Sequence, residues 1–169
     1  MSLLMKKLEG AVQRCDGLDE QAITHLGTLL APKLLAGDLI TFSGDLGAGK
    51  SVLVRAILRG LGVLDDIPSP TFTLIQHYPQ ALIPAHHADL YRLHGGDDVD
   101  ELGLEECLDG GILLVEWPER LGQINARARL DIRLEGAHEN MRDLLVMVHG
   151  SMAARIHPWP HISQKIWPN

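Results

Sequence analysis

The chain has 169 residues, of which 46% are hydrophobic, 22% are charged and 4% are aromatic, and its formal net charge is −7. This length predicts a single domain, and the scarcity of aromatic residues predicts a mainly aliphatic core. The negative charge argues against a protein that binds nucleic acid through its own basic surface. DNA binding is therefore not expected, whereas the charge does not argue against meeting RNA through a partner.

The cysteines and the apolar segments predict a cytoplasmic protein without a membrane span. Cys15 and Cys107 have no Cys or His neighbour at metal-binding spacing, so both are expected to be free thiols in a reducing compartment. At the N-terminus a short apolar run precedes Lys6 and Lys7, whereas a secretory signal places its charge first. No apolar stretch approaches the ~20 residues that a membrane-spanning helix needs.

The start of the chain predicts a tail, a strand and an interrupted helix. The first ten residues form the tail, and residues 11–15 are a candidate edge strand. Asp19 is a suitable N-cap for a helix that continues to about Ala36. Because proline removes a backbone donor and clashes with the preceding turn, Pro32 should kink or split that helix.

A phosphate-binding pattern follows an apolar segment at residues 38–43 that predicts a buried strand. Residues 44–51 match the P-loop pattern G-x-x-x-x-G-K-S, and the apolar residues after them recur at helical spacing. In such a loop glycines let successive backbone N–H groups surround an anion, and the following helix adds its positive dipole end. Lys50 is placed to reach the β- and γ-phosphates of a nucleotide, and Ser51 to offer its hydroxyl to Mg²⁺. The expected nucleotide-binding residues of the loop are Gly44, Asp45, Leu46, Gly47, Ala48, Gly49, Lys50 and Ser51.

The rest of the chain predicts further strands and short helices. Gly60 and Gly62 should end the P-loop helix, and two prolines in the next segment exclude a regular helix there. A hairpin is predicted next, with a short turn between its two strands. The predicted elements are a loop over 65–71, strands over 72–78 and 81–89, short helices over 93–109, a strand buried on both faces over 112–115, and strands over 130–134 and 144–148.

Together these elements predict an α/β fold: a single P-loop nucleotide-binding domain over residues 1–150, followed by an irregular tail over 151–169. The central sheet should be mostly parallel with an antiparallel portion, and helices should cover both faces. In such sheets ligands bind at the carboxyl ends of the strands. Glu116 and Asp89 each follow an apolar strand, so they are the candidate acids that hold Mg²⁺ or orient water.

Two further groups of polar residues allow more than one interpretation. Ser69 and Thr71 lie in the proline-stiffened loop, where P-loop enzymes place a switch that senses the γ-phosphate. Ordinary turns are also rich in Ser and Thr, so these residues alone leave both interpretations open. His86 and His87 point to opposite sides of a strand and no closed ligand set is visible, so a histidine metal site is not expected.

Five blocks of sequence, in this order, resemble the TsaE family. The P-loop block alone is generic, whereas the later blocks together are specific, and the resemblance covers roughly residues 11–150. The blocks are the P-loop, Ser-Pro-Thr-Phe-Thr at 69–73, His-Ala-Asp-Leu-Tyr-Arg-Leu at 87–93, Glu-Leu-Gly-Leu at 101–104 and Val-Glu-Trp-Pro at 115–118.

The resemblance implies a cytoplasmic ATPase of bacterial tRNA threonylcarbamoyladenosine biosynthesis that requires ATP and Mg²⁺. Such a protein acts with TsaB and TsaD, which transfer a threonylcarbamoyl group to an adenosine beside the tRNA anticodon, and ATP hydrolysis resets that machinery. By the same resemblance, Thr71 is the switch threonine, Asp89 an acidic site residue and Glu116 the glutamate on the Mg²⁺ side, with Trp117 as its aromatic neighbour in the nucleotide site. Ser51 stands where the family usually has threonine, and both residues offer a hydroxyl to the metal.

Three alternatives remain beside an ATPase. A GTPase-like switch is disfavoured because no Asn-Lys-x-Asp sequence, which reads guanine, is present. A small-molecule kinase would share the P-loop, but Arg120, Arg127 and Arg129 match only weakly the arginine-rich lid of such enzymes. In a non-hydrolysing regulatory module, ATP would only fix a binding surface.

Overall fold

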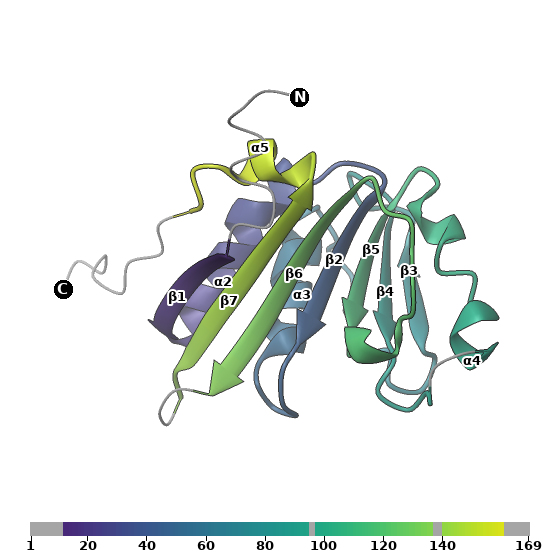
Figure 1. The fold of residues 1–169 in the computed structure, drawn as a ribbon, viewed down its shortest axis with the longest axis horizontal. Coiled ribbons are helices and arrows are strands. Elements are labelled where there is room, and N and C mark those ends of the chain that lie inside the picture. The colour runs from purple at the N-terminus through teal and green to yellow at the C-terminus, as the bar shows by residue number, and fades with distance from the viewer. Residues whose placement is uncertain (1–11, 95–96, 137–139, 161–169) are drawn as a thin grey trace.

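Seven strands form one mixed sheet in the computed structural model, which describes residues 12–94, 97–136 and 140–160. The strands are β1 (Val12–Leu18), β2 (Asp38–Ser43), β3 (Ile75–Tyr78), β4 (Ala85–Asp89), β5 (Ile112–Glu116), β6 (Ala128–Gly136) and β7 (Arg142–Gly150). Their order across the sheet is β1-β7-β6-β2-β5-β4-β3 (Figure 1). The four central strands β6, β2, β5 and β4 run parallel, and the pairs β1–β7, β6–β7 and β3–β4 are antiparallel. The predicted sheet is confirmed, with antiparallel pairs toward both edges.

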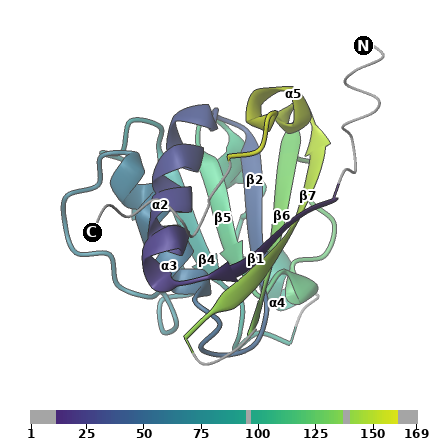
Figure 2. The same ribbon diagram turned by 90° about the vertical axis from the view of Figure 1, so that its left-hand side faces the viewer.

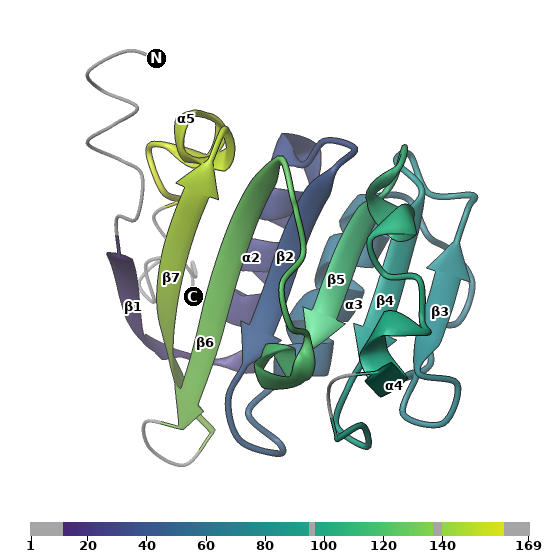
Figure 3. The same ribbon diagram turned by 45° about the vertical axis from the view of Figure 1, so that its right-hand side comes forward.

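Helices lie on both faces of this sheet, as predicted. Two long helices, α2 (Glu20–Leu30) and α3 (Lys50–Gly60), lie side by side on one face (Figure 2). Shorter segments lie over the other face near β4 and β5 (Figure 3). The short helices are η1 (Ala31–Lys33), α4 (Asp97–Asp100), η2 (Glu106–Leu108), η3 (Pro118–Arg120) and α5 (Met152–Ile156). Within the described residues, no helix is both long and apolar enough to cross a membrane.

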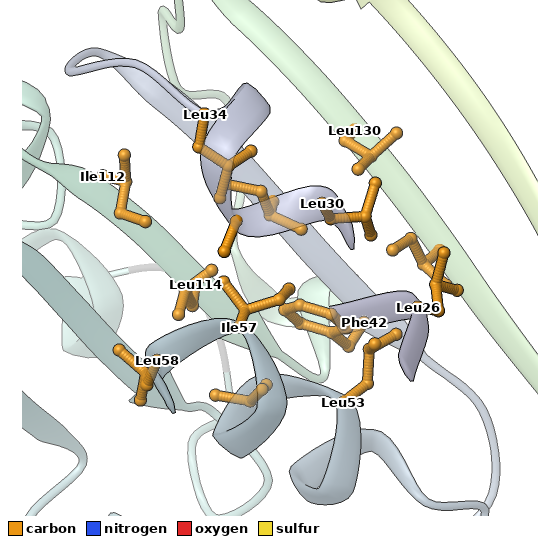
Figure 4. Packing of buried hydrophobic residues seen from close by; sticks show 14 of the residues in the cluster. Leu26, Leu30, Leu34, Phe42, Leu53, Ile57, Leu58, Ile112, Leu114 and Leu130 are labelled. Atoms are coloured by element: carbon orange, nitrogen blue, oxygen red, sulfur yellow. The ribbon is translucent and has the colours of Figure 1, made fainter. Parts of the chain in front are cut away.

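Alternating residues of the central strands supply two aliphatic clusters, one on each face. Leu114 of β5 packs toward Leu26 of α2 and Ile57 of α3 (Figure 4). Its neighbour Leu113 points the other way and joins Leu108 of η2. Each fully buried leucine of this kind stabilises the fold by about 1.5–3 kcal/mol, so the sheet is held between two apolar layers.

A close contact between α2 and α3 fixes the direction in which the P-loop helix leaves the sheet. Gly27 makes it possible, because a Cβ at this position would lie 2.4 Å from the Cβ of Ala56. Asp19 caps α2 as predicted, with its Oδ1 accepting a hydrogen bond of 2.8 Å from the N–H of Ala22. The predicted split at Pro32 is also confirmed, since α2 ends before it and a separate helix, η1, contains it.

Both strands of the predicted hairpin begin later than expected, β3 at Ile75 rather than 72 and β4 at Ala85 rather than 81. The segment before β3 is a turn, in which the N–H of Leu74 donates to the carbonyl oxygen of Pro70 at 2.7 Å. Leu74 has a left-handed φ of 64°, and the side chain of Phe72 is 82% exposed. These apolar residues resemble a strand in composition but lie outside β3, although the carbonyl oxygen of Leu74 still accepts from the N–H of Asp89 in β4 at 2.9 Å.

The segment predicted to be an irregular tail begins instead with α5. Met152 and Ile156 are buried in the core on the α2 and α3 face. The guanidinium of Arg155 donates two hydrogen bonds of 2.7 Å to the buried carboxylate of Asp38 at the start of β2. This distant ion pair and the burial of Met152 and Ile156 together hold the short helix in place. Residues 161–169 of the predicted tail lie outside the described residues.

Candidate nucleotide-binding site

The P-loop connects the C-terminal end of β2 to α3, as the sequence predicts. Gly44, Gly47 and Gly49 have φ values of 127°, 78° and 99°, which residues with a Cβ rarely adopt. A Cβ on Gly44 would lie 2.1 Å from the carbonyl oxygen of Leu134 in β6, whereas one on Gly47 would meet nothing within 4 Å. The loop is therefore pressed against the sheet at its start and open at its tip, a shape that suits an anion.

Lys50 begins α3 and is buried beneath the loop. Its Nζ donates hydrogen bonds to the carbonyl oxygens of Gly44 at 2.7 Å and Asp45 at 2.8 Å. The same atom lies 4.2 Å from the ring centre of Trp117, a cation–π contact. Burial lowers the pKa of the Lys50 ammonium, and the carboxylate of Glu116 opposes that shift. The ammonium is therefore held within reach of whatever the loop binds.

Glu116 ends β5 and is 2% exposed, and two residues hold its carboxylate. The Ser51 hydroxyl lies 3.0 Å from both carboxylate oxygens, and His87 Nε2 lies 2.9 Å from Oε1. Because a carboxylate only accepts, His87 donates through Nε2. The buried Nδ1 atom of His87 has no hydrogen-bond partner among the described residues. A P-loop residue and a strand residue thus fix the orientation of this acid.

Asp89 is the second acid of the site, and the parallel register of β4 and β5 pairs it with Glu116. Its Oδ2 accepts a hydrogen bond of 3.3 Å from Thr71, whose hydroxyl also lies 2.8 Å from that of Ser69. Its Oδ1 accepts from the backbone N–H of Tyr91 at 3.0 Å. The loop that holds Thr71 therefore contacts the sheet at one of the two predicted acids.

Trp117 follows Glu116 in an unusual backbone conformation, with φ at 60°. Positive φ is uncommon for a residue other than glycine. The Trp117 N–H donates to the carbonyl oxygen of Phe42 at 3.2 Å, which ties the end of β5 to the end of β2. Its ring centre lies 4.9 Å from that of Tyr91, so the two rings form one wall above Lys50.

These side chains surround a cleft of about 350 Å³ at the carboxyl ends of β2, β4 and β5. The cleft is lined by Leu46, Gly47, Gly49, Lys50, Ser51, Val52, Ser69, Thr71, Asp89, Tyr91, Glu116 and Trp117. Three predicted loop residues, Gly44, Asp45 and Ala48, do not line it. Gly44 and Asp45 accept the hydrogen bonds of Lys50, and Ala48 packs against the core, so these residues shape the loop.

Three residues of the site, Val52, His87 and Tyr91, were not predicted to belong to it. Side chains alternate along a strand, so His87 shares a face of β4 with Asp89, and this spacing is the signal that predicts its place. His86 lies on the opposite face, as expected, where it contacts His77. Tyr91 lies beyond the strand, in a connection where no periodicity predicts its course.

The donor set at the cleft fits a magnesium nucleotide. Ser51, Thr71, Asp89 and Glu116 present hydroxyl and carboxylate oxygens, the ligands that Mg²⁺ prefers. The P-loop backbone and Lys50 present N–H donors, which suit phosphate oxygens. The two kinds of donor line the same cleft, so a phosphate chain and its metal can be held together.

No arginine lines this cleft among the described residues. Arg92, beside Asp89 in the sequence, instead lies 4.4 Å from the ring centre of Phe72. Arg129 pairs with the first half of β2, at the end of the sheet remote from the P-loop. Arg142 donates from outside the loop to the carbonyl oxygen of Ala48 at 3.1 Å. Of the three arginines that weakly match a kinase lid, Arg129 therefore lies away from the cleft.

Comparison with known proteins identifies the family. A family model described as threonylcarbamoyl adenosine biosynthesis protein TsaE matches residues 18–144. The tRNA threonylcarbamoyladenosine biosynthesis protein TsaE of Rickettsia felis is 35% identical over 139 residues, which cover 82% of this chain and 81% of that protein. The Bacillus subtilis protein of the same name is 36% identical over 116 residues, 68% of this chain and 72% of its own length. The crystal structure of Bacillus subtilis YdiB superposes with a TM-score of 0.72 at 27% identity, covering 86% of this chain and 90% of YdiB. The chain therefore belongs to the TsaE family.

Proposed function

We propose that this chain is a Mg²⁺-dependent ATPase subunit of tRNA threonylcarbamoyladenosine biosynthesis, acting with TsaB and TsaD. The observation that carries the proposal is the 3.0 Å contact between the P-loop hydroxyl of Ser51 and the buried carboxylate of Glu116. A P-loop hydroxyl and an acid at a strand end are the pair that holds Mg²⁺ beside nucleotide phosphates in this class of enzyme. Membership of the TsaE family supports the assignment to tRNA threonylcarbamoyladenosine biosynthesis.

Each side chain of the cleft has a role in this proposal. The loop N–H groups and Lys50 bind the phosphates, while Ser51 and Glu116 hold Mg²⁺, which when bound neutralises charge on the phosphate oxygens. Asp89 lies next to Glu116 in the sheet and orients the attacking water. Thr71 contacts Asp89 and senses the γ-phosphate, so nucleotide state changes the loop around it.

The cleft also supports dependence on partners. Trp117 and Lys50 form one side of it, and the described residues around it include no arginine. An arginine that stabilises transferring phosphate contributes about 10³–10⁵ in rate and is often supplied by another protein. The isolated chain should therefore bind ATP and hydrolyse it slowly. Its net charge of −7 argues that tRNA is met through the partners rather than directly.

The test is phosphate release by the chain alone, with TsaB and TsaD separately, with both, and with tRNA. We expect slow release alone, at least severalfold stimulation by the pair, and none by free tRNA. Glu116→Gln should bind ATP within a few-fold and hydrolyse it far more slowly. Lys50→Ala should weaken ATP binding by about ten- to a hundredfold, the equivalent of a charge-assisted hydrogen bond. Arg55→Ala, an exposed change on the same helix, is the matched control for charge.

Each alternative predicts a different result. If folded Lys50→Ala binds ATP with unchanged affinity, the proposal that this cleft binds the nucleotide is wrong. If ATP binding alters the affinity for the partners but no phosphate is released, the result would favour the non-hydrolysing regulatory module. Tighter binding of GTP than of ATP in competition would favour the GTPase-like switch, and phosphate transfer to a small molecule would favour the kinase.

A further inference from the structure

Two histidines and a cysteine meet on the sheet face opposite α2 and α3. The antiparallel register of β3 and β4 pairs His77 with His86, and Cys107 of η2 belongs to the apolar cluster on this face. One ligand atom from each residue lies within 4.8 Å of the other two. The neighbouring His87 points the other way and contacts Glu116. The cluster is therefore separated by the sheet from the nucleotide cleft.

The two imidazole rings already direct nitrogen atoms at one another. Nδ1 of His77 and Nδ1 of His86 are 2.7 Å apart, and the ring planes are inclined at 78°. One nitrogen must donate the single proton between them and the other must accept it. A metal ion can replace that proton: two nitrogens at ~2.0–2.1 Å from a tetrahedral ion are about 3.3 Å apart. The rings would need to separate by only about 0.6 Å.

Cys107 is placed to complete a three-residue ligand set. A sulfur at ~2.3 Å from a tetrahedral ion lies about 3.6 Å from each nitrogen ligand. One ligand atom of each of the three residues now lies within 4.8 Å of the other two, so the sulfur and the nitrogens need to approach by about 1.2 Å or less. The Sγ has one weak contact here, 3.8 Å to the carbonyl oxygen of Gly103.

Gly111 holds two of these ligands close to the start of β5. A Cβ at Gly111 would lie 2.9 Å from His86 Nε2 and 2.9 Å from the carbonyl oxygen of Cys107. Only a residue without a side chain lets strand and helix approach the imidazole in this way. The missing Cβ therefore lets the imidazole of His86 and the backbone of Cys107 lie close together at the start of β5.

We propose that His77, His86 and Cys107 bind one Zn²⁺ ion, which joins η2 to the β3–β4 hairpin. Two imidazoles and a thiolate select zinc or copper(I) over Mg²⁺ and Mn²⁺, which prefer carboxylate and carbonyl oxygens. Zinc binds in tetrahedral geometry, so the fourth position is taken by water from the exposed side of His77. This site is independent of the proposed ATPase activity and of its Mg²⁺.

The test uses the full chain after dialysis against a chelator, with Co²⁺ as a spectroscopic probe and Zn²⁺ as competitor. We expect one ion per chain, visible absorption of a tetrahedral complex, and a near-ultraviolet thiolate-to-cobalt band that Zn²⁺ removes. Cys107→Ser should abolish the thiolate band. His77→Ala, a change at an exposed position, should weaken Zn²⁺ binding by about tenfold or more. Cys15→Ser and His25→Ala are matched controls outside the cluster and should behave as the parent.

A second measurement covers the chance that a variant folds poorly. Zn²⁺ should raise the melting temperature of the parent and both controls, because a ligand that binds only the folded state stabilises it. The rise should be clearly smaller in His77→Ala and Cys107→Ser, because their zinc affinity is lower. Failure to saturate at one ion, equal zinc affinity in the parent and His77→Ala, or a thiolate band that survives Cys107→Ser would each overturn the proposal.

Discussion

His87 offers the sharpest test of how the site holds the buried carboxylate of Glu116. Its Nε2 donates to Glu116 at 2.9 Å, and both side chains are almost completely buried. His87→Phe keeps a ring of similar size but removes the donor. His87→Gln is the matched variant, because its amide keeps an N–H group at a similar reach. Differences between these two variants therefore report on the hydrogen bond rather than on packing.

Two opposing terms set the expected effect of His87→Phe on stability. Loss of a hydrogen bond to a charged group removes about 1.5–3 kcal/mol, whereas removal of the unpartnered buried Nδ1 atom returns about 1 kcal/mol. The first term is larger, so we expect a net loss of about 0.5–2 kcal/mol. For a domain of this size each kcal/mol lowers the melting temperature by ~2–4 °C, so the shift should be about 1–8 °C. His87→Gln should lose less.

The functional effect of His87→Phe should exceed its effect on stability. Without the histidine, Ser51 is the one remaining side chain among the described residues that donates to Glu116. Partners that orient a metal ligand typically contribute about 10–100-fold in metal affinity or activity. We expect a loss of that size in ATP hydrolysis with saturating partners, with Mg²⁺-free ATP binding unchanged. His87→Gln should retain hydrolysis to within a few-fold. Hydrolysis at the parent rate by folded His87→Phe would refute the positioning role of His87.

Two other changes test the switch loop and the helix packing. Thr71→Val removes the hydroxyl that contacts Asp89. It should lower partner-stimulated ATP hydrolysis while leaving ATP affinity within a few-fold, and Thr71→Ser, which keeps the hydroxyl, is the control. Full activity of the valine variant would contradict a sensing role for Thr71. Gly27→Ala should lower the melting temperature even though alanine favours helix by about 1 kcal/mol. The new Cβ would lie 2.4 Å from that of Ala56, and overpacking of this kind typically destabilises by about 1–3 kcal/mol. Gly136→Ala, where a Cβ meets nothing within 4 Å, is the control, and equal melting curves for the two variants would show that the helices can separate freely.

The parts of the fold that were predicted correctly are those whose cause is local in the chain. The P-loop needs glycine at positions with positive φ, and its strand and helix have strong periodicity, so their places follow from sequence alone. The hairpin strands were predicted too long because Phe72 and Leu82 look like strand residues in composition but are exposed in turns. The helix α5 was missed because its five residues depend on the distant pair of Arg155 and Asp38.

The same distinction applies to the site. Asp89 and Glu116 could be predicted because each ends an apolar strand, and parallel pairing then brings strand ends together. The contact of His87 with Glu116 depends on which strands are neighbours, and β4 and β5 are adjacent although a long connection separates them. The cluster of His77 and His86 with Cys107 requires both a strand register and the position of η2. No spacing along the chain indicates such a set.

The hydrogen bonds of Lys50 explain why its removal should have a moderate effect. Its ammonium donates to the carbonyl oxygens of Gly44 and Asp45, and the Ser51 hydroxyl donates to Glu116. A bound phosphate and its metal must compete with these contacts, so nucleotide binding exchanges one set of charge-assisted bonds for another. Only the difference between the two sets contributes to affinity. The loss in Lys50→Ala should therefore lie near the tenfold end of the expected range, well below the energy of an isolated ammonium–phosphate contact.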